Sequence, residues 1–147
     1  MSVDPHPTGP VIQLAPGVEA EGLPEMLATL LRQNLEQRPE RIKDFRALHI
    51  AVGLRVVDLD MEITLRFQEG ELTIHKGLVK DPGLVITADS EIIFDLNLIR
   101  IRFGLPWYFD AQGRKILKAL LSGRLKIQGM FAHSISLTRL TKVMSVN

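Results

Sequence analysis

The stretch VVDLDMEITLRFQEGELTIHKG, residues 56–77, decides the fold class of this 147-residue chain. Apolar and polar residues alternate along it from Leu59 to Phe67, and the alternation resumes after Gly70. A period of two is typical of half-buried strands, and the glycine between the two runs indicates a turn. We therefore expect a β-hairpin in the middle of the chain.

Two helices are expected before this hairpin. Leucines recur at helical spacing from Leu23 to Leu35, and Pro24 occupies an early helical position, where its missing N–H does no harm. Pro39 ends that helix and begins a second, shorter one. Residues 1–20 are rich in proline and histidine, so we expect a flexible or extended N-terminal tail.

Another strand, two helices, a short strand and a final segment are expected after the hairpin. The strand is LVITA, residues 84–88, and the two helices begin at caps formed by residues 89–90 and by Asp110. GRLKIQG, residues 123–129, contains the short strand between two glycines. For residues 130–143, composition favours helix over strand only slightly. Strands in a run, followed by helices, indicate an α+β domain with an antiparallel sheet and helices on one face.

Composition excludes several classes of protein. The chain has no cysteine, so it has neither disulfides nor thiolate metal sites. It has no apolar run long enough to span a membrane and no pattern typical of a signal peptide, and we expect a cytoplasmic protein. Up to residue 99 it has 9 Lys/Arg and 16 Asp/Glu, and from Arg100 onward it has 9 and one. This split indicates either a surface for anionic lipid or nucleic acid, or two halves whose charges interleave in the fold.

We predict no catalytic residue, metal ion or cofactor. The four histidines lack the spacing of metal ligands, and the chain has no glycine-rich nucleotide-binding loop. His133 and Ser134 place a possible base next to a possible nucleophile in the sequence. Adjacent residues on a helix point about 100° apart, however, so the two side chains are not expected to act as a catalytic pair. We expect His133 to be partly buried instead. The basic residues of the second half alternate with apolar positions, so no nucleic-acid partner is expected.

Apolar side chains are abundant in the second half of the chain. RIRFGLPWYFD, residues 100–110, contains four of the eight aromatic residues, and the helix before it is apolar on most of its circumference. These side chains either fill a solid core or line a cavity for an apolar ligand. Since protein interiors are close-packed, composition alone favours the solid core.

Residues LVITADSEIIFDL (84–96) and LLSGRLKIQGMFAHSISLTRL (120–140) resemble the sterol carrier protein 2 (SCP2) sterol-binding domain family. The shared pattern is a strand, an acidic or serine-rich cap and a helix, then G-basic-Leu-basic-Ile/Val-x-Gly before a final helix. The hairpin also matches, and the resemblance covers roughly residues 23–143. It points to the small stand-alone prokaryotic members. Here the segment 100–110 is longer and more aromatic than the family pattern.

The resemblance implies that residues 21–147 form a lipid-binding domain. Its expected fold is a five-stranded antiparallel sheet covered on one face by about five helices, with an apolar tunnel between them. The implied function is non-catalytic binding and transfer or presentation of a lipid, fatty acyl chain, sterol or isoprenoid/quinone precursor. With the resemblance, a ligand-binding tunnel replaces the solid core as the expected arrangement of these apolar side chains. The residues expected to face the tunnel are Phe94, Leu98, Phe103, Trp107, Phe109, Ile116, Leu120, Ile127, Phe131 and Ile135.

Residues 100–110 are expected to form the lip of this tunnel and to dock transiently on an anionic membrane. The docking residues would be Arg100, Arg102, Trp107, Tyr108, Arg114, Lys115 and Lys118. A lipid-metabolising protein is a further expected partner. Two alternatives stay open: the aromatic residues plug the core, or the chain is a ligand-free protein-interaction module whose apolar patch surrounds Trp107.

Overall fold

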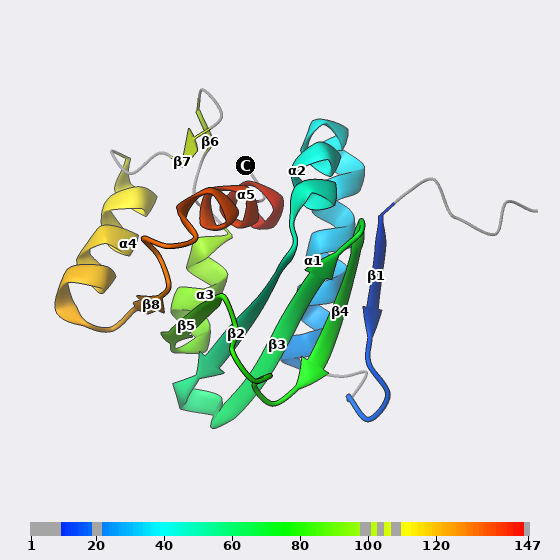
Figure 1. Cartoon of the computed structure of the whole chain (residues 1–147). Helices are drawn as coiled ribbons and strands as arrows, with labels where there is room; N and C mark the ends of the chain where they lie inside the picture. The colour runs from blue at the N-terminus through cyan, green and yellow to red at the C-terminus, as the bar shows by residue number, and fades with distance from the viewer. Residues whose placement is uncertain (1–9, 19–21, 98–100, 103–104, 107–109, 146–147) are drawn as a thin grey trace, which may run out of the picture.

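The computed structural model describes residues 10–18, 22–97, 101–102, 105–106 and 110–145 (Figure 1). In chain order, the elements are β1 (Val11–Leu14), α1 (Leu23–Gln37), the 3-10 turn η1 (Pro39–Arg41), α2 (Ile42–Ala47), β2 (Ile50–Val56), the 3-10 turn η2 (Val57–Leu59), β3 (Met61–Gln68), β4 (Glu71–Lys76), β5 (Leu84–Ala88), α3 (Ser90–Leu96), β6 (Ile101–Arg102), β7 (Leu105–Pro106), α4 (Ala111–Ser122), β8 (Lys126–Gln128) and α5 (Ser134–Met144).

The hairpin predicted from residues 56–77 is present. Strands β3 and β4 pair antiparallel, with Leu65 opposite Ile74, and a turn at Gly70 joins them. Side chains along β3 alternate between buried and exposed, except that Thr64 is also buried. The predicted alternation is confirmed, and the exception shows that part of the outer face of the sheet is covered.

The sheet is mixed and has six strands, so the prediction of five antiparallel strands is wrong. The strand order is β1-β4-β3-β2-β5-β8, with β1 parallel to β4 and β5 parallel to β2. The additional strand, β1, lies between Pro10 and Pro16, inside the segment expected to be a tail. Four residues are too few to show a periodic pattern, and proline is compatible with strands only at a sheet edge.

The second parallel pair arises because the connection between β4 and β5, residues 77–83, crosses the sheet. It passes over β3 and β2 and enters β5 on the far side of β2 (Figure 1). The span is three strand spacings of roughly 4.8 Å each, a distance that this connection can cover at roughly 3.3 Å per residue. The predicted turn at residues 81–83 therefore ends a crossover and does not close a hairpin.

The outer face of the sheet is shaped to receive this crossover. The Thr64 hydroxyl donates to the carbonyl of Gly77 at 2.7 Å and accepts from the N–H of Val79 at 3.1 Å. Gly53 is opposite Thr64 in the sheet, and a Cβ at Gly53 would lie 2.7 Å from Cδ2 of Leu78. The missing side chain therefore gives Leu78 room to pack on the strands.

The opposite face carries the helices, with α1 and α3 behind the strands and α2 at their upper end in Figure 1. Leu27, Leu31 and Leu35 of α1 are fully buried, as the leucine spacing predicted. In α2, Phe45 packs edge-to-face against Phe67 of β3, with ring centroids 6.0 Å apart. These contacts form the centre of the hydrophobic core.

The predicted starts of α3 and α4 and the predicted end of α4 are confirmed, whereas α3 ends at Leu96, before the predicted end at residue 99. Asp89 Oδ1 accepts a hydrogen bond from the N–H of Ile92 at 2.9 Å, and Asp110 Oδ1 accepts one from the N–H of Gly113 at 2.7 Å. Each carboxylate caps a helix whose first N–H groups lack backbone partners. Gly123 ends α4 with a left-handed φ of 81°, a conformation that glycine adopts without steric cost.

The last segment is helical, and its C-terminal end is held by two buried side chains. Asn34 Nδ2 donates to the carbonyl of Met144 at 2.9 Å. Arg41 Nη1 donates to the carbonyls of Lys142 at 3.0 Å and Ser145 at 2.8 Å. These carbonyls belong to the last turn of α5, where backbone partners run out. The N-terminal half of the chain therefore anchors the end of α5.

Gly129, the second glycine of the GRLKIQG motif, lies where two backbone segments meet. Its φ is 86°, and a Cβ there would overlap the carbonyl oxygen of Gly83. This contact places the end of β8 directly on the start of β5. Both the conformation and the contact exclude a side chain at position 129.

We expect Asn34→Leu to lower the free energy of unfolding by about 1–3 kcal/mol, because it leaves buried carbonyls of α5 without a donor. Urea denaturation measures this loss. Gln33→Leu, at the neighbouring exposed position, serves as the control and should change stability by less than about 0.5 kcal/mol. Equal effects of the two substitutions would contradict the anchoring role of Asn34.

We expect Gly129→Ala to be more destabilising than Gly77→Ala. Both residues have a positive φ, but a Cβ at Gly77 would meet nothing within 4 Å. The strained conformation alone costs about 1–2 kcal/mol, and the collision with Gly83 adds about 1–3 kcal/mol at position 129. Urea denaturation of both variants separates the two contributions. The close contact would be refuted by equal losses of stability.

Candidate apolar ligand site

An apolar cavity of about 60 Å³ lies between strands β5 and β8 and helices α3, α4 and α5. This is the region between sheet and helices where the tunnel was expected. All but one of its described lining residues are apolar. They are Ile86, Leu96, Ile116, Leu120, Ile127, Met130, Leu137, Leu140, Thr141 and Met144.

The cavity is not a tunnel. Its volume equals that of about two water molecules, so the described residues leave no open passage for an acyl chain. The reason is close packing. Leu140 and Met144 of α5 and Ile116 of α4 are buried together with Ile86 of β5, and they fill most of the space that the sequence left undecided.

The residues expected to line the tunnel fall into three groups in the part of the chain that the structure describes. Ile116, Leu120 and Ile127 do line the cavity. Phe94 instead lies in an open depression beside Met26 and Leu30 of α1. The side chains of the two residues nearest the start of α5 are exposed rather than inward, 90% for Phe131 and 68% for Ile135. The remaining residues lie outside the described part of the chain: Leu98, Phe103, Trp107 and Phe109.

The inward orientation expected for Phe131 and Ile135 is wrong for two reasons. Phe131 lies in the turn before α5, which begins only at Ser134. Ile135 is inside α5, but a rotation of about 100° per residue places it on the face opposite the buried Leu140. Leu137, Leu140 and Met144 were missed as cavity residues. Their helical spacing was the signal that could have identified them.

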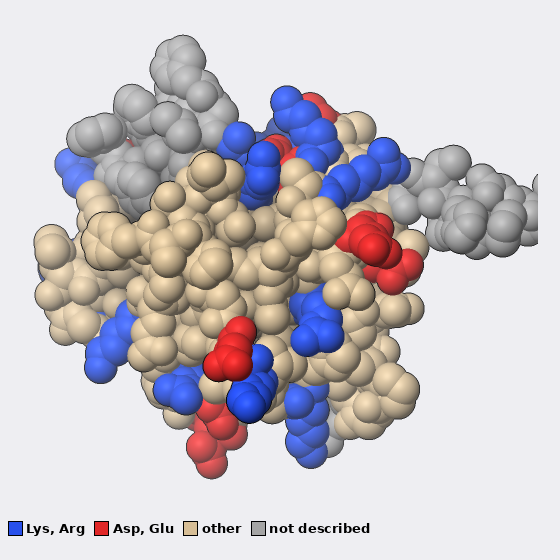
Figure 2. All heavy atoms as spheres, viewed as in Figure 1, with Lys and Arg blue, Asp and Glu red and all other residues tan. Residues whose placement is uncertain are grey.

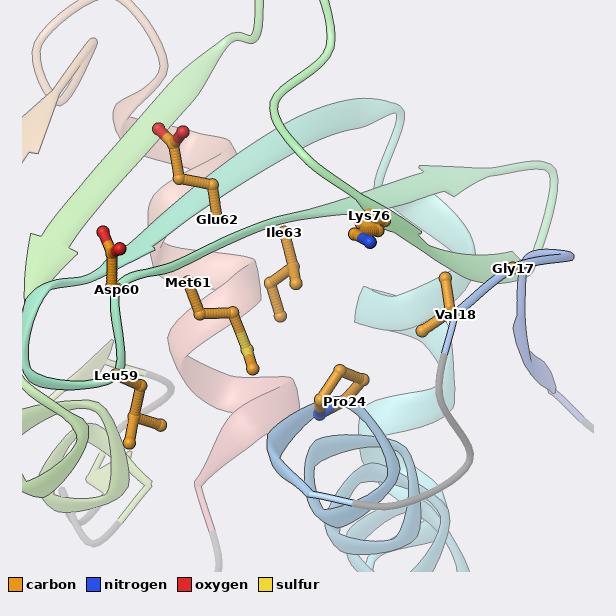
Figure 3. Close-up of a pocket in the computed structure, with 9 residues that line it drawn as sticks. All are labelled: Gly17, Val18, Pro24, Leu59, Asp60, Met61, Glu62, Ile63 and Lys76. Atoms are coloured by element: carbon orange, nitrogen blue, oxygen red, sulfur yellow. The ribbon is translucent and has the colours of Figure 1, made fainter.

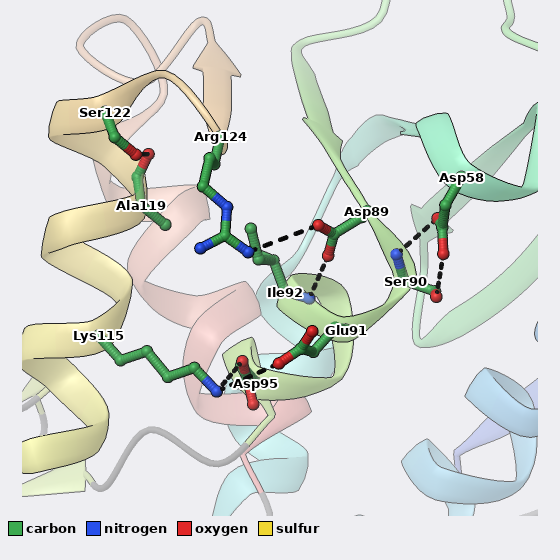
Figure 4. Close-up of polar contacts among 10 residues, drawn as sticks. All are labelled: Asp58, Asp89, Ser90, Glu91, Ile92, Asp95, Lys115, Ala119, Ser122 and Arg124. Atoms are coloured by element: carbon green, nitrogen blue, oxygen red, sulfur yellow. Dashed lines mark hydrogen bonds and ion pairs between the residues drawn. The ribbon is translucent and has the colours of Figure 1, made fainter.

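Ion pairs join two of the helices that border the cavity, α3 and α4, and the residues next to them (Figure 4). Lys115 Nζ lies 2.8 Å from Asp95 Oδ2 and 3.6 Å from Glu91 Oε1. Arg124 Nη2 lies 3.7 Å from Asp89 Oδ2. In each pair the cation comes from the basic end of the chain and the acid from the earlier part, so the charges of the two halves do interleave here.

The start of α3 is also hydrogen-bonded to η2, the turn between β2 and β3. The backbone N–H of Ser90 donates to Asp58 Oδ1 at 2.8 Å, and its hydroxyl donates to Asp58 Oδ2 at 2.6 Å (Figure 4). These hydrogen bonds hold the pKa of Asp58 below its ordinary value. Helix α3 is thus fixed at η2, whereas α4 is attached to α3 by side chains on its surface.

The residues expected to dock on a membrane fall into different environments. Arg114 and Lys118 are exposed on α4, whereas Lys115 is engaged in the ion pairs with α3. Arg102 belongs to β6. The others, Arg100, Trp107 and Tyr108, lie outside the described residues.

The described residues form no cluster that resembles a catalytic or metal centre. His133 and Ser134 are both exposed, so the expected partial burial of His133 is wrong. In the described ranges, no three His, Asp or Glu side chains gather as metal ligands would. No helix of the described part of the chain is long and apolar enough to cross a bilayer.

A second, larger cavity of about 250 Å³ opens at the other end of the sheet (Figure 3). The side chains of Val18, Pro24 and Met61 converge on it, while the carboxylates of Asp60 and Glu62 point away. Its described lining shares no residue with the apolar cavity. Its walls combine apolar and charged groups, so it is a weaker candidate for a purely apolar ligand.

Replacement of Lys115 tests the link between α3 and α4. Its pKa is raised above the ordinary value, chiefly by the hydrogen bond to Asp95. A raised lysine pKa gives stability that is complete below the unfolded pKa and is lost as the pH rises through the folded pKa. We therefore expect Lys115→Met to lower the urea midpoint near neutral pH, and the difference from wild type to shrink above pH 10.5.

Lys118→Met is the matched control, because Lys118 is exposed on the same helix and has no ion-pair partner among the described residues. It should leave the urea midpoint nearly unchanged at every pH. A loss for Lys115→Met that does not depend on pH would contradict an ionic link between the two helices.

Solved structures with the same fold identify the architecture. The chain superimposes on "UbiJ-SCP2 Ubiquinone synthesis protein" with a TM-score of 0.55 at 16% sequence identity, over 82% of this chain and 93% of that one. The sterol carrier protein domain 2 of Helicoverpa armigera gives a TM-score of 0.55 at 18% identity, over 84% and 87% of the two chains. No protein-family model and no curated protein sequence matches the chain. The fold of this chain is therefore SCP2-like.

Proposed function

We propose that this chain binds an apolar ligand between the sheet and helices α3, α4 and α5, and that it transfers or presents this ligand without covalent chemistry. The ligand class is a lipid, fatty acyl chain, sterol or isoprenoid/quinone precursor. The observation that carries the proposal is the apolar lining of the cavity, to which two sheet strands and three helices contribute. The proposal is also supported by the likeness of the fold to two solved structures, which are described as a ubiquinone synthesis protein and a sterol carrier protein domain.

Ligand entry requires the cavity to widen, and α4 is the wall best suited to move. Only Gly113, Ile116 and Ala119 of its twelve residues are buried. Its link to α3 consists of ion pairs from Lys115, half of whose side chain is exposed, to Glu91 on the surface and to the buried Asp95. By contrast, the end of α5 is held by Asn34 and Arg41. A ligand would therefore displace α4 and take over its apolar contacts.

The energetic gain comes from transfer of the ligand out of water. Each buried CH2 group contributes about 0.8 kcal/mol, so a chain of several groups offsets the contacts that Ile116 and Leu120 lose. No step of this mechanism needs a nucleophile, a base or a metal ion, and none is proposed.

Residues 100–110 retain their proposed role at the mouth of the site. The aromatic rings of Trp107 and Tyr108 suit a membrane interface, and Arg100 and Arg102 suit anionic headgroups. A transient encounter with an anionic membrane, and with a lipid-metabolising protein, follows from a carrier function. A cytoplasmic location stays a prediction.

Native mass spectrometry after mild purification tests this function. We expect a bound mass in the lipid range, displaced by an excess of a fluorescent fatty acid. Leu137→Trp fills the cavity and should weaken binding of that probe at least about tenfold, since a filled cavity leaves no site to expand. Leu30→Trp is the matched control, because Leu30 is half-buried in a helix outside the cavity.

Two results would overturn the proposal. One is the absence of any bound mass together with no binding of the fluorescent probe. The other is equal binding by the Leu137→Trp and Leu30→Trp variants. Absence of ligand combined with stable self-association would instead support the interaction module around Trp107.

A further inference from the structure

Four large apolar side chains project from the end of the molecule that carries the apolar cavity. We call them the apolar rim: Leu117, Leu121, Phe131 and Ile135. Leu121 is 89% exposed and Phe131 is 90% exposed, which leaves nearly their whole side chains in water. Single exposed apolar residues are ordinary, but such a group marks an interaction site.

Two members of the apolar rim are sequence neighbours of cavity-lining residues. Leu121 directly follows Leu120, and Phe131 directly follows Met130, and both of these neighbours line the cavity. Helix α4, strand β8 and the start of α5 lie at the same end of the molecule in Figure 1. Figure 2 shows a broad area without charged residues over these elements, with Lys and Arg side chains at its borders.

The charge around the apolar rim has one sign. Residues 111–145 include seven Lys/Arg and no Asp or Glu. Lys115, Arg124 and Lys142 have acidic partners. Arg114, Lys118 and Lys126 are exposed and have no ion-pair partner among the described residues. The cations nearest the rim in the sequence are therefore available to an anionic partner.

We propose that the apolar rim docks on an anionic lipid bilayer, with its apolar side chains among the acyl chains and the exposed cations on the headgroups. Apolar side chains flanked by lysine and arginine are typical of segments that bind at a membrane interface. A second copy of the chain is a less suitable partner for the apolar rim, because it would bring the exposed cations of the two copies together. This proposal rests on the proposed carrier function, for which it names the donor or acceptor as an anionic membrane.

The consequence is that the cavity opens toward the bilayer. Helix α4 contributes both to the rim and to the cavity wall, through Leu121 and Leu120. Binding of the rim to the membrane therefore places the wall that must move next to the source of the ligand. An apolar ligand then passes between bilayer and cavity with little exposure to water.

Co-sedimentation with vesicles tests the docking surface. The vesicles contain phosphatidylcholine with about 30% phosphatidylglycerol, a composition that supplies negative surface charge. We expect the full chain to bind them, to bind pure phosphatidylcholine weakly, and to dissociate as salt rises. Leu121→Asp combined with Phe131→Asp should reduce binding at least about tenfold, because two charges cannot enter the acyl region.

Met26→Asp combined with Val57→Asp is the matched control. These two residues are also exposed apolar residues, 54% and 61%, and the double substitution changes the net charge by the same amount. This variant should bind within about twofold of wild type, since general repulsion is its only effect. Circular dichroism and urea denaturation check that both double variants are folded.

Three outcomes would overturn the docking surface. The first is that wild type fails to bind anionic vesicles at low salt. The second is that the two double variants lose binding equally. The third is that Trp107→Ala alone abolishes binding while the rim variant binds normally. If the wild type is a dimer and the Leu121→Asp, Phe131→Asp variant is a monomer, the rim is instead an interface between two copies of the chain. Failure of the carrier function is distinguishable, because the rim would then bind vesicles although no ligand copurifies and the fluorescent fatty acid does not bind.

Discussion

The whole second half of the fold depends on the close approach of three backbone segments around β5. The crossover from β4 packs on the outer face of the sheet, where Gly53 leaves room for Leu78. The end of β8 can pair with β5 only because Gly129 tolerates contact with Gly83. Helix α3 follows β5 directly, and α4 packs on α3. An extra methyl group at Gly129 would therefore disturb the junction of β8 with β5, two of the elements that border the cavity.

The two helices that close the cavity are held in different ways, and this difference bears on function. Buried hydrogen bonds from Asn34 and Arg41 fix the last turn of α5, and a buried polar group is costly to leave without a partner. Helix α4 buries few side chains and is linked to α3 through Lys115, half of whose side chain is exposed. Regions with few buried apolar contacts open at lower free energy than the core. The fold thus combines one cavity wall held by buried hydrogen bonds and one that buries few side chains.

Electrostatics serves two purposes in the basic end of the chain. Some of its cations neutralise acids of the earlier segments and hold α3 and α4 together. Others remain exposed around apolar side chains that a water-facing surface does not need. Net charge near zero concealed this division, because the acids that offset the basic end lie in the first half of the chain. A carrier of apolar ligands benefits from such a division, since attraction to a membrane and stability of the fold then use different residues.

The local elements followed from the sequence because each is decided by neighbouring residues. Alternation predicted β3 and β4, leucine spacing predicted α1, and Asp89, Asp110 and Gly123 marked helix ends through contacts within one turn. The resemblance in residues 84–96 and 120–140 supplied the SCP2-like fold. Tertiary structure alone decided the parallel pairing of β5, the edge strand β1 and the volume of the cavity. Pairing direction depends on the path of a crossover, and a void depends on how side chains from five distant elements pack, so neither leaves a periodic signal in one segment of sequence.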